Sequence, residues 1–419
     1  MLDPRRQPHP RADPMSTVEV SAEEALADLI TRVGAARRTH IGFPAAQDMD
    51  WSAVAALTGT LLNNCGSPLD DDVFAGQTKA MEREVLATFA DLFRADVNTV
   101  RGYVSAGATE GTLWALSQAR TRHPDTIVYH SQSAHYSVGK SATLLGLPAV
   151  AVRADDSGEI DYHDLLRHLH RNAHRPATVV ATVGTTMREA VDDIRRINAG
   201  LDDIGASARW IHADAALAGV PLALLDPGSR PGIDFADGAD SIVVSGHKFF
   251  GTPMPCAVVL ARHASAGQHV TYIDAHDTTV SGSRDGHAPL ALWWALKTLG
   301  RGGLRRRAER ARRMAEYTRR RLDHLGWTAY RNVHAFTVYF KTPPEAVVSR
   351  WRLPVDAGWS HVICMPGVTR NILDAFLADM SRATAASRGQ ITKPQPGKAS
   401  RSRSTHRSTS RRGAIHAVS

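Results

Sequence analysis

The sequence predicts an α/β domain with a mostly parallel sheet, followed by a smaller α+β domain. Six short runs rich in β-branched and apolar residues recur between residues 126 and 261, and helix-like stretches separate several of them. Strands that are apolar throughout and alternate with helices are typical of parallel sheets whose two faces are both covered. After about residue 290 the pattern changes to a long helical repeat, which indicates that a second unit begins there.

The elements of the first domain follow from these runs. The expected strands lie at residues 126–130, 149–153, 178–183, 209–214, 241–245 and 257–261. The expected helices between them lie at residues 110–122, 161–174 and 191–205. An earlier stretch, residues 21–40, also carries a helical pattern.

The second unit is expected to open with a long amphipathic helix. Its apolar positions at helical spacing are Leu304, Ala308, Ala311, Ala315, Thr318, Leu322 and Leu325. Ten arginines between residues 301 and 321 mostly occupy other faces, which is typical of a helix with one solvated side. Strands at 335–340 and 360–365 and a helix near 370–383 complete this unit.

These patterns divide the chain into five parts. We expect a disordered arm over 1–20, an N-terminal helical segment over 21–60, a large cofactor-binding domain over 61–290, a small C-terminal domain over 291–386 and a disordered basic tail over 387–419. The two ends contain few large apolar side chains, so they cannot bury enough surface to offset the entropy of the free chain.

Composition excludes several classes of protein. The chain has 419 residues and a net charge of +8, and residues 388–419 alone hold eight Lys and Arg with no Asp or Glu. The rest of the chain is therefore neutral, so we expect no nucleic-acid partner. No run of 18 apolar residues and no signal-peptide core is present, so we expect no membrane partner and a cytoplasmic location. Three widely spaced cysteines form no CxxC pair, and we expect no metal site.

A lysine and an aspartate follow two of the expected strands. Lys248 comes three residues after the end of the run at 241–245, where desolvation lowers the pKa of an amine and makes it a nucleophile toward carbonyls. A lysine that simply reaches solvent is the alternative. Asp214 closes the run at 209–214 and would lie at the same edge of the sheet. It either binds a buried cation, such as the ring nitrogen of pyridoxal phosphate, or caps the next turn.

Three weaker segments also follow strand ends. The small residues at 105–111 open a helix whose first N–H groups can bind a phosphate, although a capping box has the same composition. His135 can lie flat on a cofactor ring or be an ordinary histidine. The hydroxyls of Thr185 and Thr186 can bind a phenolic oxygen or a carboxylate, or form ordinary turns. All of these groups meet where open sheets place their ligands.

Longer segments now carry a resemblance to a known family. They include NNCGSP (63–68), GATEG (107–111), IHADAALAG (211–219), SGHKFFGTPMPC (245–256) and SGSRDGHAPL (281–290). With these segments the chain resembles the pyridoxal-phosphate-dependent group II decarboxylases, specifically the short histidine/serine decarboxylase branch. The resemblance covers roughly residues 40–380, with the segments in order and at family-like spacing.

The resemblance implies an architecture, a cofactor and roles for single residues. The architecture is the pyridoxal-phosphate-dependent transferase fold (fold type I), with a seven-stranded, mostly parallel sheet, and the assembly is a homodimer. Lys248 is expected to bind pyridoxal 5'-phosphate covalently, Asp214 to pair with its ring nitrogen, and His135 to stack on its ring. The remaining expected cofactor contacts are Ala108, Thr109, Thr185, Ser245 and His247. The expected substrate contacts are His135, Phe43, Ser283 and Arg284.

The implied activity is decarboxylation of an L-amino acid to CO2 and a primary amine, with histidine as the first candidate substrate. Serine is the second. Where the family reads GYP-x-N, this chain has Phe43 and Ala46, so a less polar amino acid such as valine or leucine is a further alternative.

Two readings other than a decarboxylase remain open. A transaminase on the same fold is one of them, with Arg350, Arg352 or Arg370 as a carboxylate ligand. The other is a non-catalytic binding protein with a nucleic-acid-seeking tail, and the intact Lys248 and Asp214 argue against it.

Overall fold

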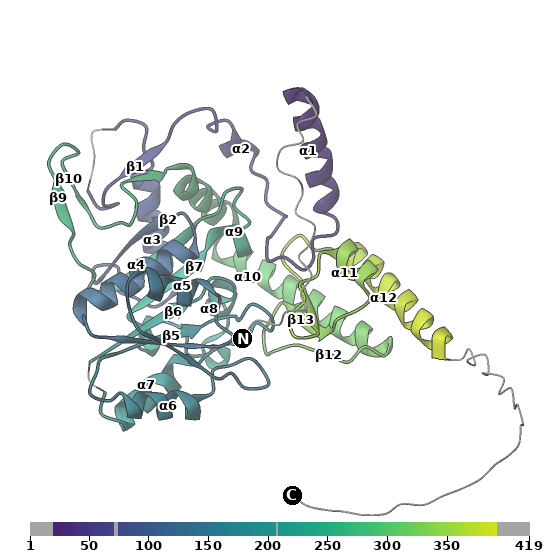
Figure 1. The fold of residues 1–419 in the computed structure, drawn as a ribbon. Coiled ribbons are helices and arrows are strands. Elements are labelled where there is room, and N and C mark those ends of the chain that lie inside the picture. Colours follow the sequence, from purple (N-terminus) through teal and green to yellow (C-terminus); the bar gives the residue numbers. More distant parts are fainter. Residues whose placement is uncertain (1–19, 71–73, 207, 392–419) are drawn as a thin grey trace, which may run out of the picture.

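A seven-stranded sheet forms the centre of the computed structural model, which describes residues 20–70, 74–206 and 208–391 (Figure 1). In spatial order the strands are β2 (Val100–Ser105), β8 (Ala257–Arg262), β7 (Ser241–Ser245), β6 (Arg209–Asp214), β5 (Ala177–Thr182), β3 (Ile127–Ser131) and β4 (Ala149–Val152). Only β8 runs antiparallel to its neighbours in this sheet. The predicted fold class and strand number are confirmed, and the six predicted runs are all strands.

The seventh strand, β2, was not among the predicted runs. Its sequence carries Arg101 and Gly102, which interrupt the pattern of apolar and β-branched residues. The strand lies at the edge of the sheet, where such residues are tolerated. Gly102 has a packing reason: a Cβ there would collide with the backbone carbonyl of Val259 on β8.

Helices cover both faces of the sheet, as the apolar strands predict. The helices of this domain are α3 (Lys79–Leu92), α4 (Ala108–Arg122), α5 (Ser137–Leu144), α6 (Tyr162–Arg171), α7 (Ile194–Asp203), α8 (Gly219–Ala223) and α9 (Gly246–Phe249), with single 3-10 turns at Pro227–Ser229 and Phe235–Asp237. On one face Val243 and Val259 pack in a cluster with Trp114 of α4. On the other face Val244 packs with Phe89 of α3. Alternate strand residues therefore serve two separate apolar layers.

The C-terminal part begins with the long helix α10 (His287–His324), which is interrupted at Gly300, where φ is 55°. It continues with a three-stranded antiparallel sheet and two helices. These elements are β12 (Ala329–Tyr330), β13 (Thr337–Lys341), α11 (Glu345–Trp351), β14 (Trp359–Ile363) and α12 (Arg370–Ile391). Arg307 departs from the predicted solvated face: it is 3% exposed and pairs with Asp48.

The tail prediction needs a correction at its start. Helix α12 continues to Ile391, whereas the prediction ended the helix near 383 and began a disordered tail at 387. Residues 384–391 hold one large apolar residue, Ile391, but their alanine, arginine and glutamine residues are good helix formers. Residues 1–19 of the predicted arm and 392–419 of the predicted tail lie outside the described residues.

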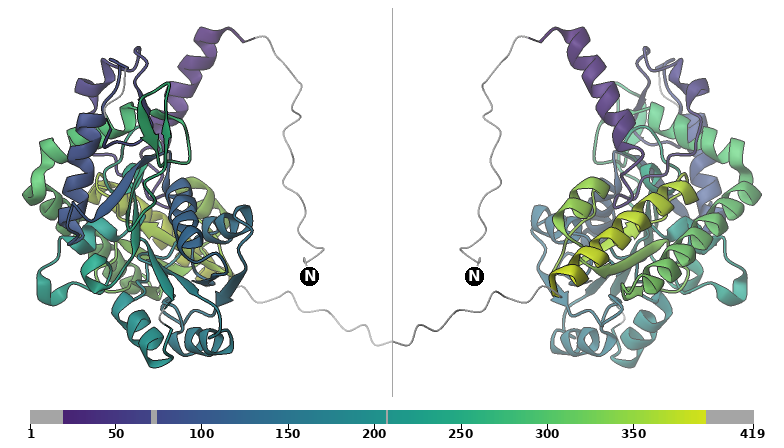
Figure 2. Two further views of the ribbon diagram at one scale, coloured as in Figure 1. Left: turned by 90° about the vertical axis from the view of Figure 1, so that its left-hand side faces the viewer. Right: turned by 90° about the vertical axis from the view of Figure 1, so that its right-hand side faces the viewer.

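The N-terminal part is a helix that stands away from the body of the protein (Figure 2). Helix α1 (Ala22–Ala36) starts with a capping box between Ser21 and Glu24. Short elements follow it: α2 (Ser52–Ala55), β1 (Asn63–Cys65) paired with β11 (Ser283–Asp285), and β9 (Gln268–Val270) paired with β10 (Ala275–Asp277). None of the helices in the described ranges is both long and apolar enough to cross a membrane.

Candidate active site

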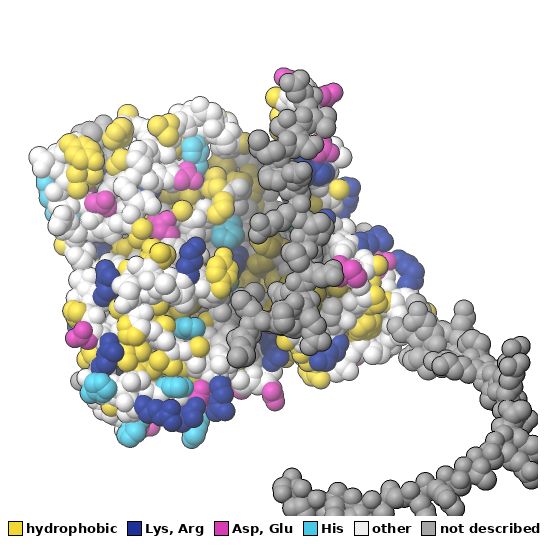
Figure 3. Space-filling view, in the orientation of Figure 1, with side chains coloured by type: hydrophobic (Ala, Val, Ile, Leu, Met, Phe, Trp, Pro, Cys, Tyr) yellow, Lys and Arg dark blue, Asp and Glu magenta, His cyan; other side chains and the backbone are white. Residues whose placement is uncertain are grey.

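A cavity of about 740 Å³ lies at the carboxyl ends of β5, β6 and β7. Its wall also includes β14 and the segment around Phe43, so the large and small parts of the chain both contribute. In Figure 3 a hollow edged by apolar side chains is visible at this junction. A ligand site at this end of an open α/β sheet is the usual arrangement.

Lys248 lies in α9, three residues after Ser245 at the end of β7, and lines the cavity. Burial lowers the pKa of its amine, and the carboxylates of Asp214 and Glu189 partly offset this effect. The amine is therefore neutral more often than that of a solvated lysine, which makes it a better nucleophile. The alternative of a lysine that only reaches solvent does not fit this position.

Asp214 is the last residue of β6 and is 6% exposed. Parallel pairing places it beside Thr182 of β5 and Val243 of β7. Its Oδ1 accepts a hydrogen bond from the backbone N–H of Ala216 at 3.3 Å. The carboxylate thus caps the turn and faces the cavity at the same time, so the two predicted roles are compatible.

The N-terminus of α4 forms one end of the cavity. Gly107 is the N-cap residue, with φ 156°, and Ala108 and Thr109 line the cavity in the first turn. The N-cap residue provides no side-chain hydrogen bond, so the capping box that was the alternative to a phosphate site is absent at this helix start. Glu110 instead accepts from the backbone N–H of Ala106 at 3.0 Å. The free first turn of a helix suits a phosphate.

His135 lines the cavity and contacts Ser137 through its Nδ1 atom. The backbone N–H of Ser137 donates to Nδ1 at 3.3 Å, so the neutral ring carries its proton on Nε2. Burial lowers the pKa of His135 and Lys248 lowers it further, while Asp214 raises it. The neutral form is therefore favoured near pH 7.

Three buried hydroxyls lack any hydrogen-bond partner within the described residues and line this cavity. They are the Oγ atoms of Ser141 and Ser245 and the Oγ1 atom of Thr182. Buried polar atoms normally have partners, so these hydroxyls indicate that a polar ligand completes the site. Together with a buried amine, a buried carboxylate and an open helix N-terminus, they fit pyridoxal phosphate.

The other predicted residues divide into two groups. Phe43 and His247 line the cavity as expected, and burial lowers the pKa of His247. Thr185 does not line it: its Oγ1 accepts from the backbone N–H of Ala190 at 3.0 Å, and Thr186 lines the cavity instead. The sequence could not show which of these two adjacent threonines lines the cavity.

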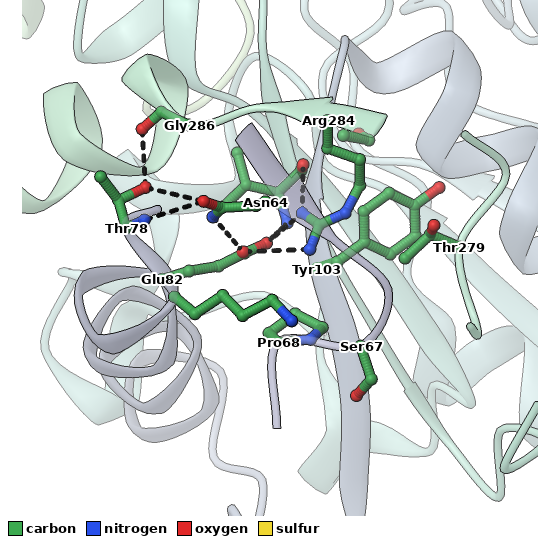
Figure 4. Close-up of polar contacts among 12 residues, drawn as sticks. Asn64, Ser67, Pro68, Thr78, Glu82, Tyr103, Thr279, Arg284 and Gly286 are labelled. Carbon is green, nitrogen blue, oxygen red and sulfur yellow. Dashed lines mark hydrogen bonds and ion pairs between the residues drawn. The ribbon is translucent and has the colours of Figure 1, made fainter. Parts of the chain in front are cut away.

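Ser283 and Arg284 lie away from the cavity of their own chain. Arg284 is buried, and its Nη1 atom lies 2.6 Å from Oε1 of Glu82 (Figure 4). Its Nη2 atom donates to the carbonyl of Gly66 at 3.0 Å. Ser283 lies on β11, opposite Cys65 of β1. Arg284 is thus committed to a buried ion pair and not to a substrate, which corrects the prediction for this residue.

Sequence reasoning also missed part of the wall. One face of α5 lines the cavity with Ser137, Lys140, Ser141 and Leu144, whose spacing is helical. This helical spacing is the sequence feature that could have indicated a helix face on the cavity wall. His361 and Ile363 come from β14, more than 110 residues after Lys248, and no local pattern connects them to the site.

Comparisons with known proteins agree with this geometry. A family model described as the pyridoxal-dependent decarboxylase conserved domain matches residues 9–341. Histidine decarboxylase of Mesorhizobium japonicum is 39% identical over 367 residues, which cover 87% of this chain and 99% of that protein. Histidine decarboxylase of Vibrio campbellii is 36% identical and covers 81% of this chain and 89% of its own length.

Solved structures show the same architecture. L-methionine decarboxylase from Streptomyces sp. 590 superposes with a TM-score of 0.78 and 26% identity, covering 87% of this chain and 96% of that one. Sphingosine-1-phosphate lyase of Burkholderia pseudomallei superposes with a TM-score of 0.72 at 20% identity, covering 89% and 94%. The second likeness concerns the fold alone.

Proposed function

Because the chain belongs to the pyridoxal-dependent decarboxylase family, we propose that it converts L-histidine to histamine and CO2. The observation that carries the cofactor is the joint placement of Lys248, Asp214 and the α4 N-terminus around one cavity, and the match to the decarboxylase family supports the reaction type. The relatives named histidine decarboxylase, at 36–39% identity over most of the chain, support the substrate. A transaminase on this fold has no comparable support.

The residues that would hold the cofactor follow from the cavity wall. Ala108 and Thr109 would bind its phosphate, Asp214 its ring nitrogen, and Lys248 its aldehyde carbon. When bound, pyridoxal phosphate supplies an electron sink for the charge that departing CO2 leaves behind. Asp214 keeps a proton on the ring nitrogen, and its buried position strengthens that interaction.

His135 and Lys248 are the groups that can handle protons near the reacting atoms. The Nε2–H of His135 is a donor that can orient a substrate carboxylate. The amine of Lys248, whose pKa is lowered by burial, can accept a proton and later return it. The enclosing wall limits access of water to these groups.

A second substrate has a specific observation in its favour. The wall of the cavity includes the apolar side chains Phe43, Leu113, Leu144 and Ile363. Such a wall suits an apolar amino acid, and the superposed L-methionine decarboxylase is named for one. Methionine, valine and leucine are therefore the competitors of histidine, with serine as a smaller polar one.

A substrate panel separates these candidates. Holoenzyme incubated with single amino acids should form histamine with a kcat/KM at least about 100-fold above that for methionine, leucine or serine, as expected if the cavity recognises the imidazole through hydrogen bonds that the other side chains cannot make. Amine and CO2 should form in equal amounts, measured by mass spectrometry and carbonate trapping. A higher rate with methionine, or keto-acid product, contradicts the proposal.

We also propose that the chain is a homodimer, because α1 exposes an apolar face. Leu26, Leu29, Ile30 and Val33 are 46–64% exposed and follow the i, i+3, i+4, i+7 pattern. No side chain of this helix is buried within the described chain, and the helix projects from the body (Figure 2). A second copy of the chain, packed against this apolar face, would form the predicted homodimer. The three buried free cysteines suit a reducing compartment and support a cytoplasmic location.

The apolar face of α1 gives a direct test of the dimer. The double variant L29D/I30D should be monomeric by light scattering at concentrations where the wild type is a dimer, because two carboxylates cannot be buried unpaired. Thr31→Asp, which adds a charge on the opposite side of the same helix, should stay dimeric. A monomeric wild type, or a double variant that remains dimeric, contradicts the proposed role of α1.

A further inference from the structure

Residues 41–47, here called the strap, cross from the small C-terminal sheet to the lysine segment. The carbonyl of Ile41 accepts from the backbone N–H of Ile363 at 2.7 Å. The N–H of Ala46 donates to the carbonyl of Lys248 itself at 3.0 Å. Between these two anchors the strap carries Phe43, which is 57% exposed and lines the mouth of the cavity.

The strap lies tightly against the small sheet at Gly42. A Cβ at this position would collide with the carbonyl oxygen of Arg352, and it would lie 2.8 Å from the ring of Pro354. The carbonyl of Gly42 belongs to the same peptide plane as the N–H of Phe43. Whatever holds that carbonyl therefore fixes the direction in which Phe43 leaves the backbone.

His361 holds that carbonyl from β14. The side chain is 2% exposed and lines the cavity, and pairing with Tyr339 of β13 fixes its backbone. Its Nε2 lies 3.2 Å from the carbonyl oxygen of Gly42. Its Nδ1 lies 3.1 Å from the carbonyl oxygen of Met187.

These two contacts compete for one proton. A neutral imidazole has a single N–H, so it donates to one carbonyl and turns a lone pair toward the other. Burial lowers the pKa of His361, while the two carbonyls raise it, so the ring is neutral near pH 7. At any time, therefore, one of the two carbonyl groups receives no hydrogen bond from His361.

We propose that His361 is a positioning residue that latches the strap. With the proton on Nε2 the ring holds Gly42 and keeps Phe43 in place over the cavity. With the proton on Nδ1 it holds Met187, next to Thr186 of the cavity wall, and Gly42 loses this contact, so that Phe43 can shift between the two backbone anchors and admit the substrate. The inference rests on the proposed function only for its kinetic test, because the hydrogen exchange of the strap can be measured without turnover.

Two amide variants of His361 distinguish its contact with Gly42 from its contact with Met187. In His361→Gln the longer side chain can place its NH2 group where Nε2 was, and in His361→Asn the shorter one can place it where Nδ1 was. His361→Asn should raise KM about fivefold, as expected for one lost hydrogen bond, and should speed amide exchange at residues 42–46. His361→Gln should restore KM to within about twofold of the wild type and restore the exchange rates.

A double-mutant cycle tests whether the effect passes through Phe43. In a Phe43→Ala background, His361→Asn should add no further increase in KM. Equal behaviour of the Asn and Gln variants, or additive effects in the cycle, overturns the latch. If neither variant folds, the wild type decides: its strap amides should exchange faster than those of residues 361–363, and equal protection overturns the proposal. If the enzyme does not turn over histidine but the variants show the expected KM changes with another amino acid, only the proposed substrate is wrong.

Discussion

Replacing Lys248 with alanine is expected to lower turnover by at least about a thousandfold, because it removes the amine at the end of β7, and the other lysine of the cavity wall, Lys140, lies on α5. The variant should also lose the visible absorbance of covalently bound pyridoxal phosphate after dialysis. Burial lowers the pKa of the Lys248 amine, which is the property that lets it attack a carbonyl near neutral pH. Absorbance spectra and steady-state amine formation measure the two effects.

A matched control for this experiment is Lys297→Ala. Lys297 is a half-exposed surface lysine on α10 that pairs with Glu84 at 2.6 Å. Exposed ion pairs contribute little to stability, so this variant should keep both absorbance and turnover within about twofold. If the Lys248 variant retains cofactor that borohydride can fix to the protein, then another residue binds the aldehyde and the assignment of Lys248 is wrong.

The fold could be predicted from the sequence where strands are buried on both faces. All six apolar runs became strands because parallel strands covered by helices read as continuous β-branched segments. Strand β2 was not predicted, because its Gly102 interrupts the pattern of β-branched residues. The close approach of β8 requires a glycine at this position. The end of α12 was placed too early because a lack of apolar residues was taken for disorder, although helix propensity continues to Ile391.

The site could be predicted where residues follow strand ends. Lys248, Asp214 and His135 are each adjacent in sequence to a parallel strand, and the sheet brings such ends together. Side chains that reach the cavity from other elements, such as His361, depend on how the small sheet docks. Arg284 was misplaced because a motif does not tell whether its arginine faces a ligand or, as here, the buried Glu82.

Asp214→Asn is expected to reduce kcat by at least about a hundredfold while the protein remains folded and binds its cofactor. Asparagine is isosteric and its Oδ1 can still accept from the backbone N–H of Ala216, so the turn after β6 should persist. A neutral amide cannot stabilise the protonated ring nitrogen, and the loss of one buried ion pair costs several kcal/mol. The expected deficit therefore lies in the chemical step and not in folding.

A pH profile distinguishes this loss from a merely structural one. The Asp214 carboxylate raises the pKa of both His135 and Lys248, so its removal should move the titrations of these groups to lower pH. Any acid limb of the residual activity should shift in that direction. Asp226→Asn, which removes only an exposed carboxylate paired with Arg305, should leave kcat and the profile unchanged. Near-normal turnover in the Asp214 variant would show that another group protonates the ring nitrogen, and the electron sink would then need no carboxylate at this strand end.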